Sequence, residues 1–258
     1  MQHPERVTEL LLKIGAVQIS VSKPFVWTSG VTAPIYCDLR KLYGHPRERA
    51  RIADALTDLI RRSAIMPEGI AGTATAAIGW AALVAERLDL PFAYVRPMAK
   101  EHGTRKRVEG DLPKGKRILV IEDLLSTAGS AVATVAALRE ECAADVSDVV
   151  AIFSYELPVA FVNARRCRVR LSPLTTISAV LALDRAEGGL TDAARLEVQL
   201  FLKDPEGWTV GHTKTARGLH AVALNRMELL VSEGHINPAD PAMRHMHDWS
   251  AYWRNVRE

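Results

Sequence analysis

From Gly69 onward, short apolar segments alternate with segments of helical periodicity. The apolar segments are, in order, GIAG, FAYVR, ILVIED and DVVAIFSY. The first is followed by the helical AAIGWAALVAERL, the second by the polar segment Pro97–Pro113, and the third by the helical SAVATVAALREEC. Short strands that are apolar on both faces and alternate with helices indicate a parallel sheet covered by helices on both sides. We therefore predict an α/β fold around a central, mostly parallel sheet.

The residues around this pattern predict further elements. An amphipathic helix is expected over residues 7–14, and a second helix is expected to begin at Pro46. Residues 25–43 break short apolar pieces with glycine and proline, which is typical of strands and turns. Two more helices are predicted over Thr176–Glu187 and Thr191–Lys203.

Composition limits the class of protein. The chain has 258 residues, of which 48% are hydrophobic and 24% charged, so it can bury a sizeable core. It has no apolar run of the ~18 residues that span a membrane and no apolar signal-peptide core. Its three cysteines are too far apart to indicate a disulfide framework or a zinc site, and a net charge of +3 does not indicate nucleic acid. We expect a soluble, cytoplasmic protein with no membrane or nucleic-acid partner.

The chain divides into a main domain and an appendage. We assign residues 1–208 to the α/β domain, with a small hood drawn largely from residues 1–45, and residues 209–258 to a helical C-terminal extension of unknown role. The extension contains one predicted helix, Leu219–Ser232, and an aromatic-bearing polar tail. A histidine pair in that tail offers a metal site only if the tail is ordered.

Two adjacent acids, Glu122 and Asp123, follow four apolar residues at the end of a predicted strand. In open parallel sheets, ligands bind outside the carboxyl ends of the strands. A buried carboxylate is costly unless it has a partner, so hydroxyl groups, a metal or basic residues are expected to meet this pair.

The loop after the acids is built from small residues and precedes a helix. Backbone N–H groups at a helix N-terminus form an anion cradle, and the hydroxyls of Thr127 and Ser130 add donors. The acid pair thus offers acceptors for hydroxyl groups, and the loop beside it offers donors for a phosphate. A ribose 5-phosphate has both kinds of group. An ordinary strand, turn and capped helix is the structural alternative. If Ala128 adopts a positive φ, its Cβ costs on the order of 1 kcal/mol.

Four segments carry a resemblance to known proteins. ILVIEDLLSTAGSAV resembles the phosphoribosyl pyrophosphate (PRPP) motif of the type I phosphoribosyltransferases. The N-terminal signature of the orotate phosphoribosyltransferase family resembles FVWTSGVTAPIYCDLR, and its mobile loop resembles YVRPMAKEHGTRKRVEG. The family also matches IAGTATAAIGWAALVA. The resemblance covers roughly residues 5–208 and implies the type I fold, with the small N-terminal hood.

The resemblance implies a role for each loop. Glu122 and Asp123 would bind the ribose 2- and 3-hydroxyls, residues 126–130 the 5-phosphate, and residues 72–76 the pyrophosphate. A tight strand-to-helix turn would also need small residues at 72–76. The implied PRPP-binding residues are Glu122, Asp123, Leu124, Leu125, Ser126, Thr127, Ala128, Gly129, Ser130, Gly72, Thr73, Ala74, Thr75 and Ala76.

The N-terminal signature would close over the orotate ring. Its implied contacts are Thr28, Ser29 and Gly30. An aromatic wall from Phe25 or Trp27 is one alternative, and core packing of either ring is the other. Tyr36, Asp38 and Arg40 are expected to form mainly a structural cluster around this site.

The catalytic residues implied are Arg96, Lys100, His102 and Asp123. The three cationic side chains would stabilise the charge that develops on the leaving pyrophosphate, with Arg105 as general electrostatic support. In this family the loop acts across a dimer interface, so a homodimer with shared sites is implied. Mg²⁺ would arrive with PRPP rather than in a protein cage.

This sequence differs from the usual pattern of the family at several positions. Pro97 and Met98 stand where the mobile loop usually carries a second lysine, and Ala128 replaces a glycine. These changes keep two alternatives open: a phosphoribosyltransferase for another base, and a regulatory protein that binds PRPP without turnover. The N-terminal signature argues against the first alternative, and the retained Lys100 and His102 argue against the second.

Overall fold

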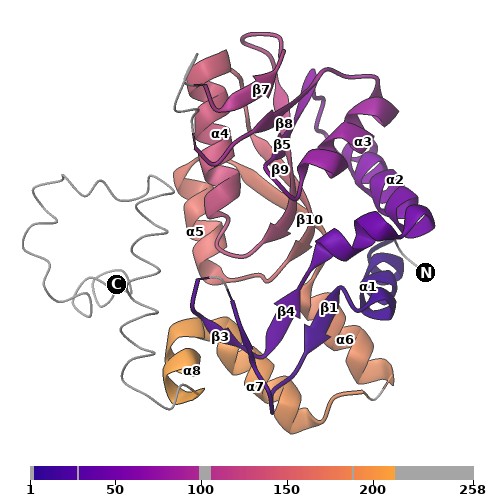
Figure 1. Cartoon of the computed structure of the whole chain (residues 1–258), viewed down its shortest axis with the longest axis vertical. Helices are drawn as coiled ribbons and strands as arrows, with labels where there is room; N and C mark the ends of the chain where they lie inside the picture. The colour runs from indigo at the N-terminus through magenta and orange to yellow at the C-terminus, as the bar shows by residue number, and fades with distance from the viewer. Residues whose placement is uncertain (1–2, 28, 99–105, 188, 213–258) are drawn as a thin grey trace, which may run out of the picture.

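The computed structural model describes residues 3–27, 29–98, 106–187 and 189–212. Its elements in chain order are α1 (His3–Ile14), β1 (Val17–Ile19), β2 (Phe25–Val26), β3 (Thr32–Ala33), β4 (Ile35–Cys37), the 3-10 helix η1 (Leu39–Gly44), α2 (Pro46–Arg62), β5 (Gly69–Thr73), α3 (Ile78–Leu88), β6 (Phe92–Val95), β7 (Val108–Gly110), β8 (Ile118–Leu125), α4 (Gly129–Cys142), β9 (Asp148–Ser154), α5 (Pro158–Arg166), β10 (Arg170–Thr176), α6 (Ile177–Glu187), α7 (Asp192–Lys203) and α8 (Pro205–His212) (Figure 1).

Within these residues, six strands form the central sheet in the order β10-β9-β8-β5-β6-β7. Every neighbouring pair is parallel except β6 and β7, which are antiparallel. The predicted α/β class and mostly parallel sheet are confirmed. Two short antiparallel pairs, β1 with β4 and β2 with β3, form the hood near one edge of this sheet (Figure 1).

Helices cover both faces of the sheet, with α2 and α3 on one side and α4 and α5 on the other (Figure 1). Alternate residues of β8 separate accordingly. Leu119 and Ile121 pack with α2, α3 and the hood, whereas Ile118 and Val120 pack with α4 and α5. This explains why the strand is apolar on consecutive positions rather than alternating.

The strand order reverses between β5 and β8. From β5 the chain passes through α3 to β6 on one side, while β8 lies on the other side and leads through α4 to β9. Such crossovers are right-handed. A helix that leads toward one edge of the sheet therefore lies on the opposite face from a helix that leads toward the other edge, and a crevice is left at the carboxyl ends of β5 and β8. This switch point places the loops that follow β5 and β8 beside each other.

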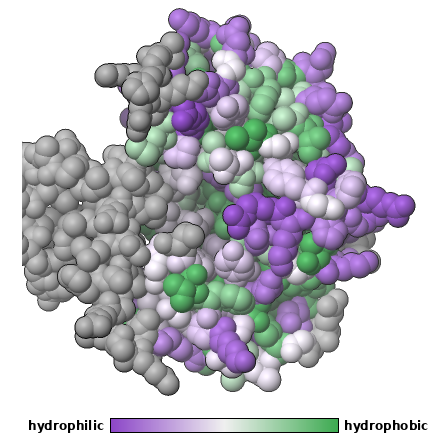
Figure 2. Space-filling model, viewed as in Figure 1, coloured by the Kyte–Doolittle hydropathy of each residue, from purple (hydrophilic) through white to green (hydrophobic). Residues whose placement is uncertain are grey.

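Helix α2 shows why the flanking helices form where predicted. It begins at Pro46, whose fixed φ suits the first helical position, and it buries Ile52, Leu56 and Ile60 on one face. Its opposite face is charged, and hydrophilic residues gather along the corresponding right-hand edge in Figure 2. The predicted helices near residues 7–14, 176–187 and 191–203 are present as α1, α6 and α7.

Some elements differ from the prediction. The strand with the acids continues two residues beyond Asp123, because Leu124 and Leu125 pair with β9. Helix α8 spans residue 208, and the hydroxyl of Thr209 donates to the Thr32 carbonyl of the hood at 3.0 Å. The division after residue 208 stays a prediction, and the predicted helix Leu219–Ser232 and the tail histidines lie outside the described residues. No described helix is long and apolar enough to cross a bilayer.

Helix α4 ends at Ala143, which is exposed and adopts a left-handed conformation at φ 51°. Because glycine adopts this conformation without a Cβ penalty, we expect Ala143→Gly to stabilise the protein by about 0.5–1 kcal/mol and to raise Tm by roughly 1–3 °C. Thermal unfolding followed by circular dichroism measures the change. Ala136→Gly, at an exposed position inside the same helix, should instead destabilise by about 1 kcal/mol. If both variants were more stable than the parent, or both less stable, the left-handed conformation of Ala143 would be contradicted.

Candidate active site

The acid pair lies inside β8, near the switch point. Glu122 is 5% exposed, and its Oε1 accepts a hydrogen bond from the Asp123 N–H at 3.0 Å. Its Oε2 is buried and has no hydrogen-bond partner among the described residues. A buried acceptor without a partner costs about 1–3 kcal/mol, so it is expected to meet a ligand.

The two carboxyl groups are close enough to affect each other's ionisation. Burial, and then the charge of Asp123, raise the pKa of Glu122 well above its usual value. Burial also raises the pKa of Asp123. Asp123 belongs to the hood side, since its charge adds to the burial that raises the pKa of Cys37.

The loop after β8 forms an N–H cradle. Ala128 adopts a positive φ, 61°, immediately before α4 begins at Gly129. Within the described part of the chain, the N–H groups of Ser126, Thr127 and Ala128 donate no hydrogen bond. The side chains of Leu124 and Leu125 pack in the core, so these two residues can offer a ligand only backbone groups.

A residue outside the motif fixes this cradle. Asn163 of α5 donates from Nδ2 to the Thr127 carbonyl at 3.0 Å. A short loop held at its carbonyl leaves its N–H groups available for an anion. No local pattern indicates this contact, because the two residues are 36 positions apart.

The loop after β5 has little room for side chains. A Cβ on Gly72 would lie 2.8 Å from the Ala81 Cβ and 3.0 Å from the Ala77 carbonyl, so this position needs glycine. The peptide bond between Ala74 and Thr75 is cis. Among the described residues, the N–H groups of Thr75 and Ala76 donate no hydrogen bond.

A buried hydroxyl pair links the two halves of the site. Thr134 of α4 donates to Oγ1 of Thr73, at the end of β5, over 3.1 Å. The pair joins the strand before the 72–76 loop to the helix after the 126–130 loop. Both loops are therefore held in one packed unit.

The cationic segment is attached to the β6–β7 hairpin. The Arg96 guanidinium lies 3.7 Å from the Glu109 carboxylate, and the Arg96 carbonyl accepts from Nε of Arg107 at 2.9 Å. No described contact joins Arg96 to the acid pair. Lys100, His102 and Arg105 lie outside the described residues.

Glu141, near the end of α4, holds this hairpin in place. Its carboxylate accepts from the backbone N–H groups of Arg107 at 2.9 Å and Val108 at 3.1 Å. Sequence reasoning did not identify Glu141, since a glutamate in the last turn of a helix carries no such signal.

In the hood, Trp27 packs in the core. Its Nε1 donates to the Ile35 carbonyl at 2.9 Å, and its ring stacks on Tyr155 with centroids 4.8 Å apart. Phe25 stacks instead on Tyr36, with centroids 5.4 Å apart. Of the predicted orotate contacts, Gly30 forms the turn between β2 and β3 at φ 83°, Ser29 is partly exposed, and Thr28 lies outside the described residues.

The predicted cluster around the hood is present. Asp38 forms an ion pair with Arg40 at 2.7 Å, and this contact lowers the pKa of Asp38. The exposed guanidinium of Arg40 also lies in the field of Asp123, which acts with Asp38 to raise the pKa of Arg40. The hood therefore places a cation near the acid pair.

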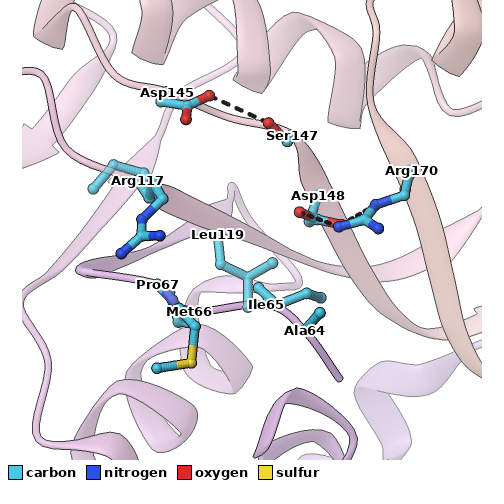
Figure 3. A pocket seen from close by; sticks show the side chains of 11 residues that line it. Ala64, Ile65, Met66, Pro67, Arg117, Leu119, Asp145, Ser147, Asp148 and Arg170 are labelled. Carbon is cyan, nitrogen blue, oxygen red and sulfur yellow. Dashed lines mark hydrogen bonds and ion pairs between the residues drawn. The ribbon is translucent and has the colours of Figure 1, made fainter. Parts of the chain in front are cut away.

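A cavity of about 190 Å³ lies away from these groups, at the amino ends of β8, β9 and β10 (Figure 3). Arg170 pairs there with Asp148 at 2.8 Å, and Arg117 pairs with Glu68 at 3.5 Å. Because these charges satisfy one another, the cavity does not compete with the carboxyl edge as the candidate site. Among the described residues, no group of three or more histidine, cysteine or acidic side chains is placed to hold a metal ion.

Comparison with known proteins decides the family. Residues 39–167 match the model of the phosphoribosyl transferase domain. The orotate phosphoribosyltransferase of Levilactobacillus brevis is 42% identical over 204 residues, which cover 79% of this chain and 97% of that protein. The chain belongs to the orotate phosphoribosyltransferase family. The family member from Coxiella burnetii is 39% identical over 208 residues, covering 81% of this chain and 99% of its own length.

A solved structure of an orotate phosphoribosyltransferase from Aeropyrum pernix shares the fold, with a TM-score of 0.61 and 31% identity. It covers 71% of this chain and 99% of that one. The predicted family and type I fold are thus confirmed. About a fifth of this chain has no counterpart in the two curated family members.

The burial of Glu122 makes a testable difference to stability. Its raised pKa means that the folded protein binds a proton more tightly than the unfolded chain does. The contribution of Glu122 to stability is therefore greatest below the usual glutamate pKa of 4.5 and falls as pH rises toward the folded pKa. Glu122→Gln removes this ionisation, so we expect it to be about 1–2 kcal/mol more stable than the parent near pH 8, with the difference vanishing near pH 4.

Thermal unfolding at a series of pH values checks this expectation. Glu140→Gln is the matched control, because Glu140 is exposed on α4, and its difference from the parent should not change with pH. A Glu122→Gln protein no more stable than the parent near pH 8 would show that the buried carboxylate is not a stability penalty.

Proposed function

We propose that this protein transfers the phosphoribosyl group of PRPP to a ring nitrogen of orotate, giving orotidine 5-phosphate and pyrophosphate, in the synthesis of pyrimidine nucleotides. Its membership of the orotate phosphoribosyltransferase family supports this reaction. The observation that carries the proposal in the structure is the unpartnered Oε2 of Glu122 between two loops with free N–H groups.

In this proposal the acid pair grips the ribose. Glu122 and Asp123 accept hydrogen bonds from the 2- and 3-hydroxyls, which replaces the water lost on burial of the carboxylates. Asp123 lies on the hood side of β8, next to the reacting carbon. When the C1–O bond weakens and the ribose becomes oxocarbenium-like, its negative charge favours the positive charge on the sugar.

The two loops hold the two ends of PRPP. Residues 126–130 bind the 5-phosphate through N–H groups at the start of α4, where the helix dipole adds a favourable field. Residues 72–76 bind the pyrophosphate through backbone N–H groups. Fixing both ends places the reacting carbon against the base, so that positioning contributes much of the rate.

The leaving pyrophosphate needs further positive charge. Mg²⁺ would supply part of it when bound with PRPP, and the carboxylates of Glu122 and Asp123 are oxygen groups of the kind that this ion prefers. Arg96, Lys100 and His102 supply the rest. The hood residues Thr28, Ser29 and Gly30 close over orotate.

The proposal includes a homodimer in which Lys100 and His102 serve the neighbouring subunit's site. The resemblance of residues 94–110 to the mobile loop of the family supports this arrangement.

A regulatory protein that binds PRPP without turnover is the second candidate. Met98, where a lysine is usual, is 71% exposed and adds no charge to the segment. Loss of one cation is expected to slow the reaction rather than to abolish it.

A direct assay tests the reaction. Purified protein mixed with PRPP, Mg²⁺ and orotate should consume orotate, measured as loss of its absorbance. Asp123→Asn should lower kcat by about 100-fold or more, because it removes charge next to the reacting carbon. Turnover with another base instead of orotate would identify a different acceptor. Saturable PRPP binding without turnover on any base would favour the regulatory protein.

Mixing variants tests the shared site. Lys100→Ala should lower kcat far more than it weakens PRPP binding, because its charge acts mainly on the transition state. Mixed with inactive Asp123→Asn protein, it should regain part of the activity, since one site of each mixed dimer then has all of its parts. The separate variants, assayed at the same total concentration, are the controls. Additive residual rates would exclude a site shared between subunits.

A further inference from the structure

Tyr43 connects the hood side of the molecule to the loop at residues 72–76. It belongs to η1, and its hydroxyl donates to the Ala76 carbonyl at 2.6 Å. Its ring stacks on Trp80 of α3, with centroids 4.8 Å apart and planes 20° apart. One rigid side chain therefore holds both the end of the loop and the first turn of the helix that follows it.

The sequence of α3 leaves room for this contact. A Cβ on Gly79 would lie 2.8 Å from both Cε1 and Oη of Tyr43, closer than such atoms approach. Glycine at this position of a helix is unfavourable by about 1 kcal/mol relative to alanine, so its presence needs a packing reason. Close approach of the Tyr43 ring provides that reason.

The backbone that carries Tyr43 is itself held. Leu39 and Leu42 of η1 are buried, and Arg49 of α2 donates to the Tyr43 carbonyl at 2.6 Å. Burial, with a contribution from the charge of Asp123, raises the pKa of Tyr43 to about 12, so its hydroxyl keeps its proton at physiological pH. Tyr43 thus presents a fixed donor to the loop at residues 72–76.

We propose that Tyr43 is a positioning residue for the leaving pyrophosphate. By holding the Ala76 carbonyl, its hydroxyl fixes the peptide group that follows Ala76 and so restrains the two preceding peptide groups. Their N–H groups, at Thr75 and Ala76, have no partner among the described residues and receive the anion. The inference rests on the proposed reaction and adds to it a residue outside the loop. An anion site made of backbone groups depends on such support, because a loop that must order itself on binding loses affinity.

Tyr43→Phe isolates the hydroxyl, since phenylalanine retains the ring that stacks on Trp80. We expect this variant to weaken the binding of magnesium pyrophosphate about fivefold, as loss of one hydrogen bond implies, with the KM for orotate within about twofold of the parent value. Isothermal titration calorimetry with pyrophosphate and Mg²⁺ measures the first quantity, and steady-state kinetics measures the second.

Two further variants complete the test. Gly79→Ala displaces the ring and should weaken pyrophosphate binding in the same direction as Tyr43→Phe. Ser63→Ala is the matched control, because it also removes a hydroxyl that donates to a backbone carbonyl, that of Ile60 at 2.7 Å, at the far end of α2. It should leave the affinity for pyrophosphate unchanged.

The outcomes separate the two proposals. Parent protein that does not bind magnesium pyrophosphate would overturn both the reaction and the role of Tyr43. Parent-like affinity in Tyr43→Phe would overturn only the role of Tyr43. Equal losses for pyrophosphate and orotate would also overturn it, since general loosening does not discriminate between the two ends of the site.

Discussion

The buried carboxylate of Glu122 is the constraint around which this molecule is arranged. The apolar strand β8 carries two adjacent acids, and one oxygen of Glu122 has no hydrogen-bond partner among the described residues. Packing alone would favour an apolar residue there. The rest of the sheet is well packed, and in the proposed function the two carboxylates serve as acceptors for the ribose hydroxyls.

The sheet topology gives this pair its setting. Because the strand order reverses between β5 and β8, two strand-to-helix loops meet at one edge, each rich in unpaired N–H groups. One loop follows the strand that bears the acids, and the other lies beside it. In the proposed function, the phosphates at the two ends of PRPP meet these two loops and its hydroxyls meet the acid pair, at the edge where parallel sheets generally bind ligands.

Local patterns predicted most of the sheet and the loops, because both are set by neighbouring residues. Residues 118–142 are an apolar strand, a small loop and a helix, and each piece is clear in sequence. The three-residue strand β7 was missed because it pairs only through its neighbour β6. Helix α5 was not assigned, since Phe161 and Val162 are exposed and obscure its amphipathic pattern. Contacts from Tyr43, Asn163 and Glu141 join residues 33 to 36 positions apart and became visible only in three dimensions.

The hydrogen bonds from the β6–β7 hairpin to Glu141 also fix how far the hairpin lies from the start of helix α4. Glu141 stands twelve residues beyond Gly129, so helix α4 separates the hairpin's anchor from the phosphate cradle by about 18 Å, at ~1.5 Å per residue. Helix α4 thus acts as a spacer that sets the distance between the hairpin that carries Arg96 and the N–H cradle at the start of the helix.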